Sequence, residues 1–463
     1  MSLSIGLDTA AKALRVHQLA VDVASHNIAN AQTPGFSRQR VILRQDGFAS
    51  GGYDSIIGKS GTGVTATDVL RVRDLFLDFQ SRQTAGAKAQ NESFSDAVGR
   101  AELTFNEPGD NGIAALMGQF FNAWHDVVND PESSAARIAL VHATTTLTAN
   151  IQRASNDLQN LRADVNKDVV GLQDQINSRA EELASLNQQI VEVEASGDTA
   201  NDLRDRRDQI LDELSGLGQI TYSESNNHAV NVYLGNHELV SNSTFNAVQA
   251  VNDPGNPGME KLVFQQDGVD VTSNTGKLKG LLDARDISIP GVQAKLDTLA
   301  SDMITKVNAV HATGYGLDNT TGQPFFTGTN AATISLNAVL ATNPEKIAAS
   351  SLTGTVGNSA NALAIADLQK TTSAALNGNT FDQFYSNIVT VLGADVARAD
   401  GLAGSAGLLN DHIQAQRQSV SGVNIDEEVT NMTAAQHAFN AASKVIATID
   451  SMLDTLINHT GVG

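Results

Sequence analysis

Residues 25–40 read SHNIANAQTPGFSRQR, and this stretch decides how the N-terminal part of the chain folds. Asn30 can end a helix, and Pro34 favours an extended conformation at Thr33. Pro34 and Gly35 fit the two central positions of a type II turn. The residues after the turn are typical of an extended chain or a strand. We therefore predict a helix that ends here, a turn, and then an extended segment.

The residues before this turn have the pattern of an amphipathic helix with a narrow apolar seam. The seam positions alternate gaps of four and three residues, as in a coiled coil. They are Leu3, Leu7, Ala10, Leu14, His17, Val21, Ala24 and Ile28. Because charged residues such as Asp8 and Lys12 interrupt the apolar pattern, we do not expect a cleaved secretory signal.

The C-terminal end of the chain carries a matching pattern, again with gaps of three and four residues. Its positions are Met432, Ala435, Phe439, Ala442, Ile446, Ile449, Leu453 and Leu456, and Val445 and Met452 widen the stripe. Asn424 or Asp426 can cap a helix, and the acidic residues 426–428 favour the positive end of its dipole. We predict a helix over about 425–458, ~50 Å long at 1.5 Å per residue.

Neither terminal helix can bury its stripe alone, because isolated helices gain most of their stability from packing. The simplest solution packs the two ends of the chain together and leaves an apolar edge for neighbouring copies. The expected assembly interface consists of Leu3, Leu7, Leu14, Val21, Ile28, Met432, Phe439, Ile446, Ile449, Leu453 and Leu456.

The interior predicts long helices and a small β-rich insertion. A helical stripe runs from about 135 to 193, ends at ASGD (195–198), and is followed by another helix. Residues 229–240 and 261–271 have a period of two around Gly-Asn and Asp-Gly, which favours two hairpins.

The expected fold is α+β and mostly α, with paired terminal helices, a long central helical bundle and a small β-rich inserted domain. The expected domains are a terminal helical (inner-tube) domain, 1–40 plus 421–463, a central long-helix domain, 41–221 plus 277–420, and the insertion, 222–276.

Composition excludes several classes of function. The 463 residues carry a net charge of -21 and contain no cysteine, so disulfides and thiolate chemistry are excluded, and nucleic acid is not an expected partner. The densest basic cluster, Arg204 with Arg206 and Arg207, alternates with Asp and is expected to be a solvated helix face. No apolar run reaches the ~18 residues that a membrane helix needs, so no membrane partner is expected.

No catalytic constellation stands out. GKSGTG (58–63) has the wrong spacing for a phosphate-binding loop, and the ten histidines are scattered. Trp124, with Phe120, Phe121 and Val127, is spaced for a helix face that packs in a core. We expect no catalytic, metal or cofactor site and therefore no enzyme.

SHNIANAQTPGFSRQRV (25–41) resembles the N-terminal signature of bacterial flagellar axial proteins, roughly N-N-I-A-N-A-x-T-x-G-[FY]. Ser25 and His26 replace its first part, with His26 where Asn is usual. The version from Thr33 to Gln39 is similar to the hook-associated protein 1 family of hook–filament junction proteins. Rod and hook proteins usually continue differently after the Gly–aromatic pair.

Other stretches resemble blocks of the same family in the same order along most of the chain. They are GTGVTATDVLRVRDLFLDFQSR (61–82), FFNAWHDVVNDPESSAARIAL (120–140), ANDLRDRRDQILDELS (200–215), GKLKGLLDARD (276–286), GQPFFTG (322–328), NPEKIAASS (343–351) and the C-terminal block 421–457.

The resemblance implies a structural protein that polymerises as the adaptor between hook and filament. It implies an extracellular flagellar protein, exported unfolded by the flagellar type III export apparatus without a cleaved signal. The implied partners are further copies of the chain, the hook protein, hook-associated protein 3 on the filament side, and an export chaperone.

In this family the paired terminal helices form an inner tube. The resemblance therefore places the end of the inner-tube helix at a junction turn, made by Asn27, Asn30, Thr33, Pro34, Gly35 and Phe36.

Two alternatives stay open. The chain can be another flagellar axial protein, a hook or distal rod component, because such proteins have terminal helices of the same kind. A surface binding module on a helical stalk would need its site in 222–276, where no catalytic constellation is found.

Overall fold

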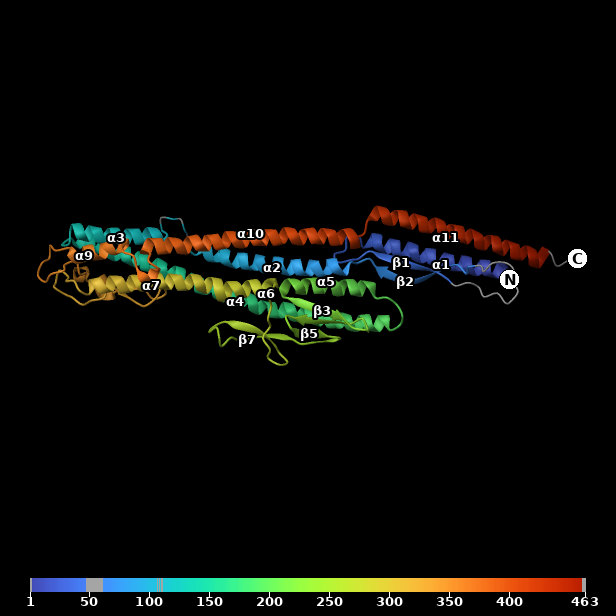
Figure 1. Ribbon diagram of the computed structural model, residues 1–463, viewed down its shortest axis with the longest axis horizontal. Coiled ribbons are helices and arrows are strands. Elements are labelled where there is room, and N and C mark those ends of the chain that lie inside the picture. The colour runs from blue at the N-terminus through green and yellow to red at the C-terminus, as the bar shows by residue number, and fades with distance from the viewer. Residues whose placement is uncertain (1, 47–60, 106, 108, 110, 460–463) are drawn as a thin grey trace. The chain divides into compact units, whose positions relative to one another are not determined.

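We describe the protein in a computed structural model, which covers residues 2–46, 61–105, 107, 109 and 111–459. The chain forms two compact units. The first comprises Met1–Gly86, Ile176–Ala247 and Gly407–Gly463, and the second comprises Ala87–Gln175 and Val248–Ala406. Helices dominate both units and the strands form small sheets, so the predicted α+β, mostly α fold is confirmed (Figure 1). The three-part division into domains stays a prediction.

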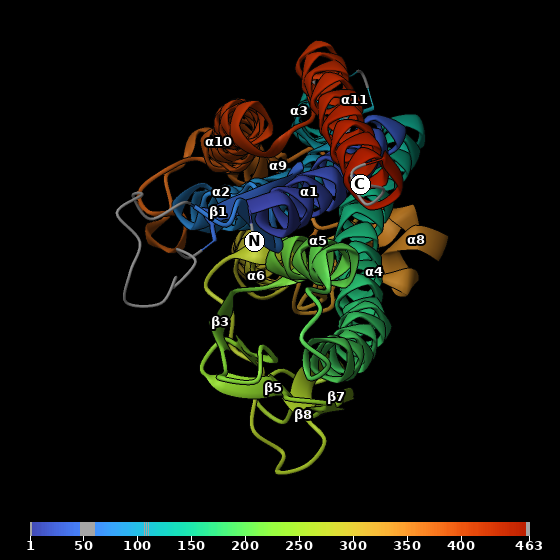
Figure 2. The same ribbon diagram turned by 90° about the vertical axis from the view of Figure 1, so that its right-hand side faces the viewer.

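The first unit contains the two terminal helices, α1 (Ser2–Ala29) and α11 (Ile425–Asp454), which pack side by side (Figures 1 and 2). They are antiparallel, because Gly6 lies beside Ile449 whereas the Ser25 hydroxyl donates to the Met432 sulfur at 3.7 Å. A short π-helix, η5 (Thr455–His459), extends α11. The two ends of the chain thus pack together as their stripes predict.

A β-hairpin packs against the other side of α1. It pairs β1 (Gln39–Gln45) with β2 (Val64–Arg71) in antiparallel register, with a bulge between Ile42 and Leu43. Val16, which lies outside the predicted seam, is buried. The seam pattern missed this residue because α1 packs against both the hairpin and α11 and therefore needs a second buried face.

The rest of the first unit surrounds α5 (Asn201–Leu217) and the C-terminal part of α4 (Ser134–Glu194). A four-stranded antiparallel sheet follows in the order β3 (Ile220–Glu224), β4 (Val230–Leu234), β5 (His237–Ser241) and β6 (Thr244–Phe245). The predicted hairpin at 229–240 is confirmed, and Gly235 at its turn has φ 62°. The amide of Asn187 on α4 bonds to both backbone groups of Val230 and so fixes the sheet to the helix.

The second unit is also helical. Its helices are parts of α2 (Leu75–Leu103), α4 and α10 (Phe381–Ser421), with α3 (Ile113–Asn129), α6 (Gly276–Asp283), the π-helix η1 (Ala284–Ser288), α7 (Ile289–His311), α8 (Ala338–Thr342) and α9 (Ala360–Ala366). Short 3-10 turns are η2 (Pro344–Lys346), η3 (Asp367–Lys370) and η4 (Ala374–Leu376), and the strand pairs are β7 (Val248–Asn252) with β8 (Glu260–Phe264) and β9 (Phe326–Thr327) with β10 (Ser335–Leu336).

The second predicted hairpin, 261–271, is present but short. Across its turn the N–H of Phe264 donates to the carbonyl of Val269 and the N–H of Val271 to that of Leu262, each at 2.8 Å, and a bridge joins Val263 to Asp270, whereas the longer strand pairing of residues 260–264 is with β7. The Asp267-Gly268 turn is present, with φ 72° at Gly268. The local turn signal could not reveal that an earlier segment supplies the main partner.

Aromatic side chains fill the core of the second unit. Phe120, Phe121, Trp124 and Val127 of α3 are each 0% exposed, which confirms their predicted core role. The Trp124 ring lies 5.1 Å from that of Phe325 and 6.4 Å from the imidazole of His311, measured between ring centroids.

His311 makes this core sensitive to acid. It is 0% exposed; its Nδ1 donates to the carbonyl of Gln323 at 2.7 Å, and its Nε2 accepts from the N–H of Ala348 at 3.0 Å. These two bonds require the neutral imidazole, because a protonated Nε2 could not accept. Burial, helped by the charge of Arg137, lowers the pKa of His311 to about 4.

We predict that the free energy of unfolding of the second unit falls by about 3 kcal/mol through His311 between pH 7 and pH 4. The unfolded chain takes up the proton near pH 6.5, whereas the folded chain takes it up only near pH 4. Stability is therefore fully present above the unfolded pKa and lost as pH falls through this window. Urea unfolding at both pH values would test this, with His311→Gln compared with the exposed His437→Gln as control. Equal losses in the wild type and His311→Gln would contradict it.

Candidate assembly site

The junction turn closes as its sequence predicts. The N–H of Phe36 donates to the carbonyl of Thr33 at 3.2 Å, and Gly35 has φ 82°, which fits a type II turn. Thr33, Pro34 and Gly35 are exposed, and the Phe36 ring meets His26 edge-on at 5.4 Å between centroids. The turn is thus closed by a hydrogen bond and accessible to solvent.

Asn27 joins three elements at this turn. Its side chain is 0% exposed, and its amide donates to the carbonyl of Gln39 at 2.8 Å and to the carboxylate of Glu428 at 2.9 Å. Its amide oxygen accepts from the N–H of Gln39 at 2.9 Å. One residue of α1 therefore holds both the start of β1 and the start of α11.

We call Asn27 and Glu428, with the groups that they bind, the clamp. Glu428 is the member of the clamp that lies on α11. It is 2% exposed and also accepts from the Nε of Arg38 at 2.8 Å. Arg38 donates its backbone N–H to the carbonyl of Ser421 at 2.8 Å, just before α11 begins. Asn424 caps α11, accepting from the N–H groups of Asp426 and Glu427. The clamp thus fixes the direction in which both terminal helices leave the turn.

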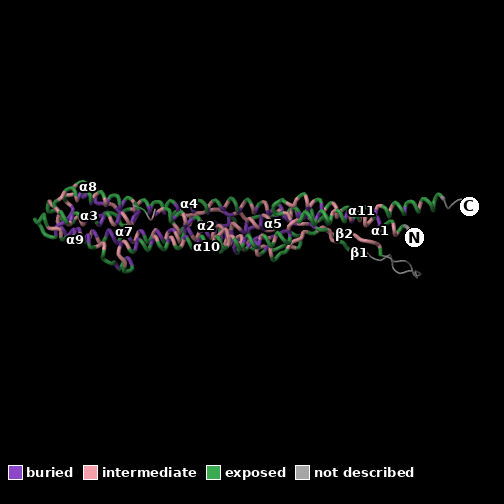
Figure 3. The backbone as a smooth tube through the Cα atoms, turned by 90° about the horizontal axis from the view of Figure 1, so that it is seen from above, coloured by how far each residue is buried: buried purple, intermediate pink, exposed green. Residues whose placement is uncertain are grey.

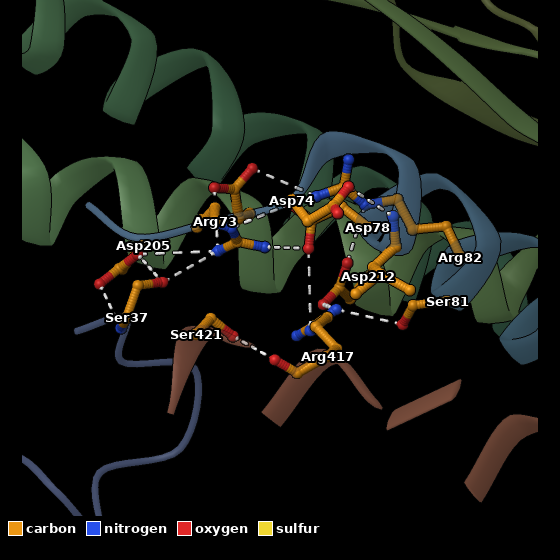
Figure 4. A network of polar contacts seen from close by, with 12 residues as sticks. Ser37, Arg73, Asp74, Asp78, Ser81, Arg82, Asp205, Asp212, Arg417 and Ser421 are labelled. Carbon is orange, nitrogen blue, oxygen red and sulfur yellow. Dashed lines mark hydrogen bonds and ion pairs between the residues drawn. The ribbon is translucent and has the colours of Figure 1, made fainter. Parts of the chain in front are cut away.

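A buried network of ion pairs lies next to the clamp in the first unit (Figure 4). Its eight charged members are Arg71, Arg73, Arg82 and Arg417 with Asp78, Asp205, Asp208 and Asp212. Four positive and four negative charges balance. The network joins β2, α2, α5 and α10, which are far apart in the sequence.

Asp208 and Asp205 each lie within hydrogen-bond or ion-pair distance of several partners in this network. The Asp208 carboxylate lies 2.8 Å from Arg71 and 3.2 Å from both Arg73 and Arg82. Burial alone would raise the pKa of Asp208, but the charges of these arginines outweigh it and hold the pKa well below its usual range. Asp205 accepts from the N–H and the hydroxyl of Ser37 at 2.8 and 2.7 Å, which ties the network to the turn.

The expectation that 201–214 presents a solvated charged face is wrong for part of this helix. Asp205 is 5% exposed and Arg207 is 3% exposed. Arg204 and Arg206 pair with Glu194 and Glu182 of α4, each at 2.6 Å. Alternating charges could not reveal this, because the partners come from other segments.

The predicted interface residues lie on α1, α11 and η5 and differ in exposure. Ile449 is buried, whereas Leu7 and Leu456 are exposed. The half-buried residues are Leu14, Val21, Ile28, Met432, Phe439, Ile446 and Leu453. The side chain of Leu3 and the first residues of GKSGTG (58–60) lie outside the described part of the chain.

One flank of α11 stays uncovered beside its contact with α1. Val445 and Met452 are 48% and 51% exposed, and at 100° per residue they share one side of α11, next to buried Ala442 and Ile449. Leu456, 53% exposed, follows in η5, which extends α11. Figure 3 shows α11 largely exposed toward its C-terminal end. We call Val445, Met452 and Leu456 the α11 flank. In the described residues it is an apolar surface that α1 does not cover.

Within the described residues, no group of three or more His, Asp or Glu side chains is arranged to hold a metal ion, and no helix is long and apolar enough to cross a membrane. The residues described above thus form a hydrogen-bonded cluster at the turn and an exposed apolar surface on α11.

Known proteins match this chain along its whole length. The flagellar hook-associated protein 1 of Bacillus subtilis is 28% identical over 510 residues, covering 100% of this chain and 99% of that protein. That of Escherichia coli is 24% identical over 554 residues, covering 98% and 99%. The family described as "Flagellar hook-associated protein FlgK helical domain" matches residues 98–326.

The chain belongs to the flagellar hook-associated protein 1 family. This family consists of structural proteins of the bacterial flagellum at the junction between hook and filament. The solved flagellar hook junction protein FlgK of Burkholderia pseudomallei has the same fold, with a TM-score of 0.62 at 17% identity, covering 73% of this chain and 100% of that one.

The two ends of this hook-associated protein match broader flagellar families. Residues 7–36 match the "Flagella basal body rod protein" family, and residues 413–459 match the "Flagellar basal body rod FlgEFG protein C-terminal" family. These ranges contain most of α1 with the turn, and α11 with its clamp. The two ends of the chain therefore resemble those of other flagellar axial proteins. The match of the helical interior to the hook-associated protein family argues against a hook or rod component.

Proposed function

We propose that this hook-associated protein assembles through its α1–α11 pair, with the α11 flank covered by neighbouring copies. The exposure of Val445, Met452 and Leu456, about half each, is the observation that carries this proposal. Contiguous exposed apolar surface can mark a site of protein–protein interaction. The proposal includes the predicted interface residues and the expected inner-tube role of the terminal domain.

The clamp gives the terminal pair a fixed exit from the rest of the chain. Asn27 and Glu428 are both nearly inaccessible, and each bonds to groups on other segments. A rigid exit lowers the entropy lost when copies associate, because fewer orientations must be frozen. The junction turn residues thereby act in positioning the helices.

The partners that we propose are those of an axial protein. They are further copies of the chain, the hook protein on one side, hook-associated protein 3 on the other, an export chaperone and the flagellar type III export apparatus. The family places the chain in the flagellum. We infer an extracellular location reached without a cleaved signal, in line with the amphipathic N-terminal helix that the matched range 7–36 covers.

We propose a structural role without catalysis. The family is one of structural flagellar proteins, and the described residues present packing surfaces and ion pairs that suit such a role.

Adding the purified chain to isolated hooks would test this function. Negative-stain electron microscopy should reveal short caps at the distal ends of the hooks, and a chain ending at Asn424 should form none. Binding to rods, or long homopolymers without hooks, would favour the alternative axial role. Capping by the shortened chain would contradict assembly through α11.

A further inference from the structure

Three large apolar side chains at the start of α2 are exposed, and they lie outside the α1–α11 pair. Leu75, Phe76 and Phe79 are 78%, 65% and 56% exposed. Their spacing of one, three and four residues places them on one side of the helix. We call these three residues the α2 knob. Exposed aromatic side chains carry large apolar surface, and such residues often anchor interfaces.

The α2 knob is held rigidly. Asp74 caps the helix by accepting from the N–H groups of Phe76 and Leu77 at 2.9 and 3.3 Å. Asp78, on the same turn, pairs with Arg73 at 2.6 Å within the buried network. A preorganised helical turn loses little conformational entropy on binding.

The second unit contains an open groove of about 760 Å³. One wall is α10, where Ile388, Leu392, Ala399 and Leu402 line the groove over roughly 20 Å at 1.5 Å per residue. The opposite wall runs along α6, η1 and α7, and residues 90–94 of α2 form part of the floor. The groove thus lies among three helical segments and has room for several large side chains of another helix.

The π-helix η1 shapes this groove. It projects Ile287 into the wall at 68% exposure, and Leu402 on the facing wall is 52% exposed. Single-turn π-helices interrupt the regular spacing and often occur at functional positions. Two exposed apolar side chains therefore face a hollow that nothing in the described chain fills.

We propose that the groove of one copy binds the α2 knob of a second copy of this chain. This inference rests on the proposed function, since it adds a contact to the same assembly. A helix laid in a hydrophobic groove is a common mode of recognition, and Leu75, Phe76 and Phe79 have the spacing of its anchors. Both complementary surfaces occur on one chain, so each copy can give a knob and receive one.

Two further features favour a second copy as the occupant. A contact between two different surfaces is heterologous, and such contacts join many copies into a ring or an open helical array. Asp74 at the base of the knob is acidic, and Lys295 on the groove wall has no ion pair among the described residues. A contact between these opposite charges would offset part of the repulsion between chains that each carry a net charge of -21.

Disulfide cross-linking would test the contact in the assembled protein. The chain contains no cysteine, so introduced thiols are the only ones present. The full chain with Phe79→Cys and Leu402→Cys, assembled on isolated hooks and then oxidised, should give a ladder of linked copies. A matched pair, Phe79→Cys with Val356→Cys, should give none, since Val356 is 42% exposed but does not line the groove.

A second set of variants separates this contact from the terminal helices. Phe76→Ser with Phe79→Ser should melt like the wild type, because both residues are exposed, but need about tenfold more protein to cap hooks. Leu352→Ser with Val356→Ser, also exposed, should cap like the wild type.

Each outcome decides one point. Normal capping by the knob variant without a ladder overturns this inference and leaves the proposed function standing. Lost capping without a ladder assigns the knob to another partner, such as the hook protein, and also overturns it. Wild-type chain that never caps hooks contradicts the proposed function and this inference together.

Discussion

Val445→Asp together with Met452→Asp is expected to abolish assembly while lowering the free energy of unfolding by only about 1–2 kcal/mol. The two side chains are 48% and 51% exposed on the α11 flank, so the isolated chain loses little packing. In an assembly each copy would bury two extra carboxylates against apolar neighbours, which costs several kcal/mol per unpaired charge. The variant should therefore fail to cap hooks at any practical concentration.

The matched control carries the same added charge on the opposite side of the same helix. Asn440→Asp with Ala447→Asp changes two exposed positions that face away from α1. It should cap hooks as the wild type does. Urea unfolding of both variants would show whether the monomer is intact. Normal capping by the flank variant, or its loss through unfolding, would argue against the α11 flank as the interface.

Asp208→Asn is expected to lower the free energy of unfolding of the first unit by about 3–5 kcal/mol. The substitution keeps the shape but leaves Arg71, Arg73 and Arg82 without the carboxylate they surround. Because these arginines stay charged and are largely buried, the folded chain keeps one positive charge that neither a carboxylate nor water compensates. Chemical unfolding followed by circular dichroism would measure the loss.

Asp202→Asn is the control for this substitution, since Asp202 lies on the same helix with a side chain 67% exposed. This substitution should lower the free energy of unfolding by no more than about 1 kcal/mol, as for exposed ion pairs. Acid should act on the wild type in the same direction as Asp208→Asn. The pKa of Asp208 is held low in the folded chain, so its contribution is present above the unfolded pKa, near 4, and is lost as pH falls below it. Equal losses in the two variants would mean that the network contributes nothing.

Local patterns predicted the elements whose partners lie nearby or whose stripes are long. The seam of 3–28 and that of 432–456 predicted the terminal helices, and the Pro34-Gly35 pair predicted the turn. The long stripe predicted α4, which ends one residue before ASGD. These signals succeed because periodicity and turn chemistry depend on neighbouring residues.

Contacts between distant segments could not be read in this way. Asn27 looked like an ordinary residue of a turn, yet its partner Glu428 lies 401 positions away. Asp205 and Asp208 alternate with arginines as on an exposed helix, but they bind Arg71 of β2, Arg82 of α2 and Arg73 between these elements. In the sequence, segments 71–82 and 204–212 are both rich in charged residues. This composition does not reveal which arginine pairs with which aspartate.

The accessibility of a single thiol would test the central claim most directly. Met452→Cys places the only cysteine of the chain on the α11 flank, and the rate of its alkylation can be compared between the free chain and chain assembled on hooks. The account predicts fast reaction in the free chain and at least ~10-fold slower reaction after assembly, the factor that about 1.4 kcal/mol of protection gives. A thiol introduced by Asn440→Cys should react at similar rates in both states. A thiol at position 452 that is protected in the free chain, or equally reactive in both states, would contradict the account.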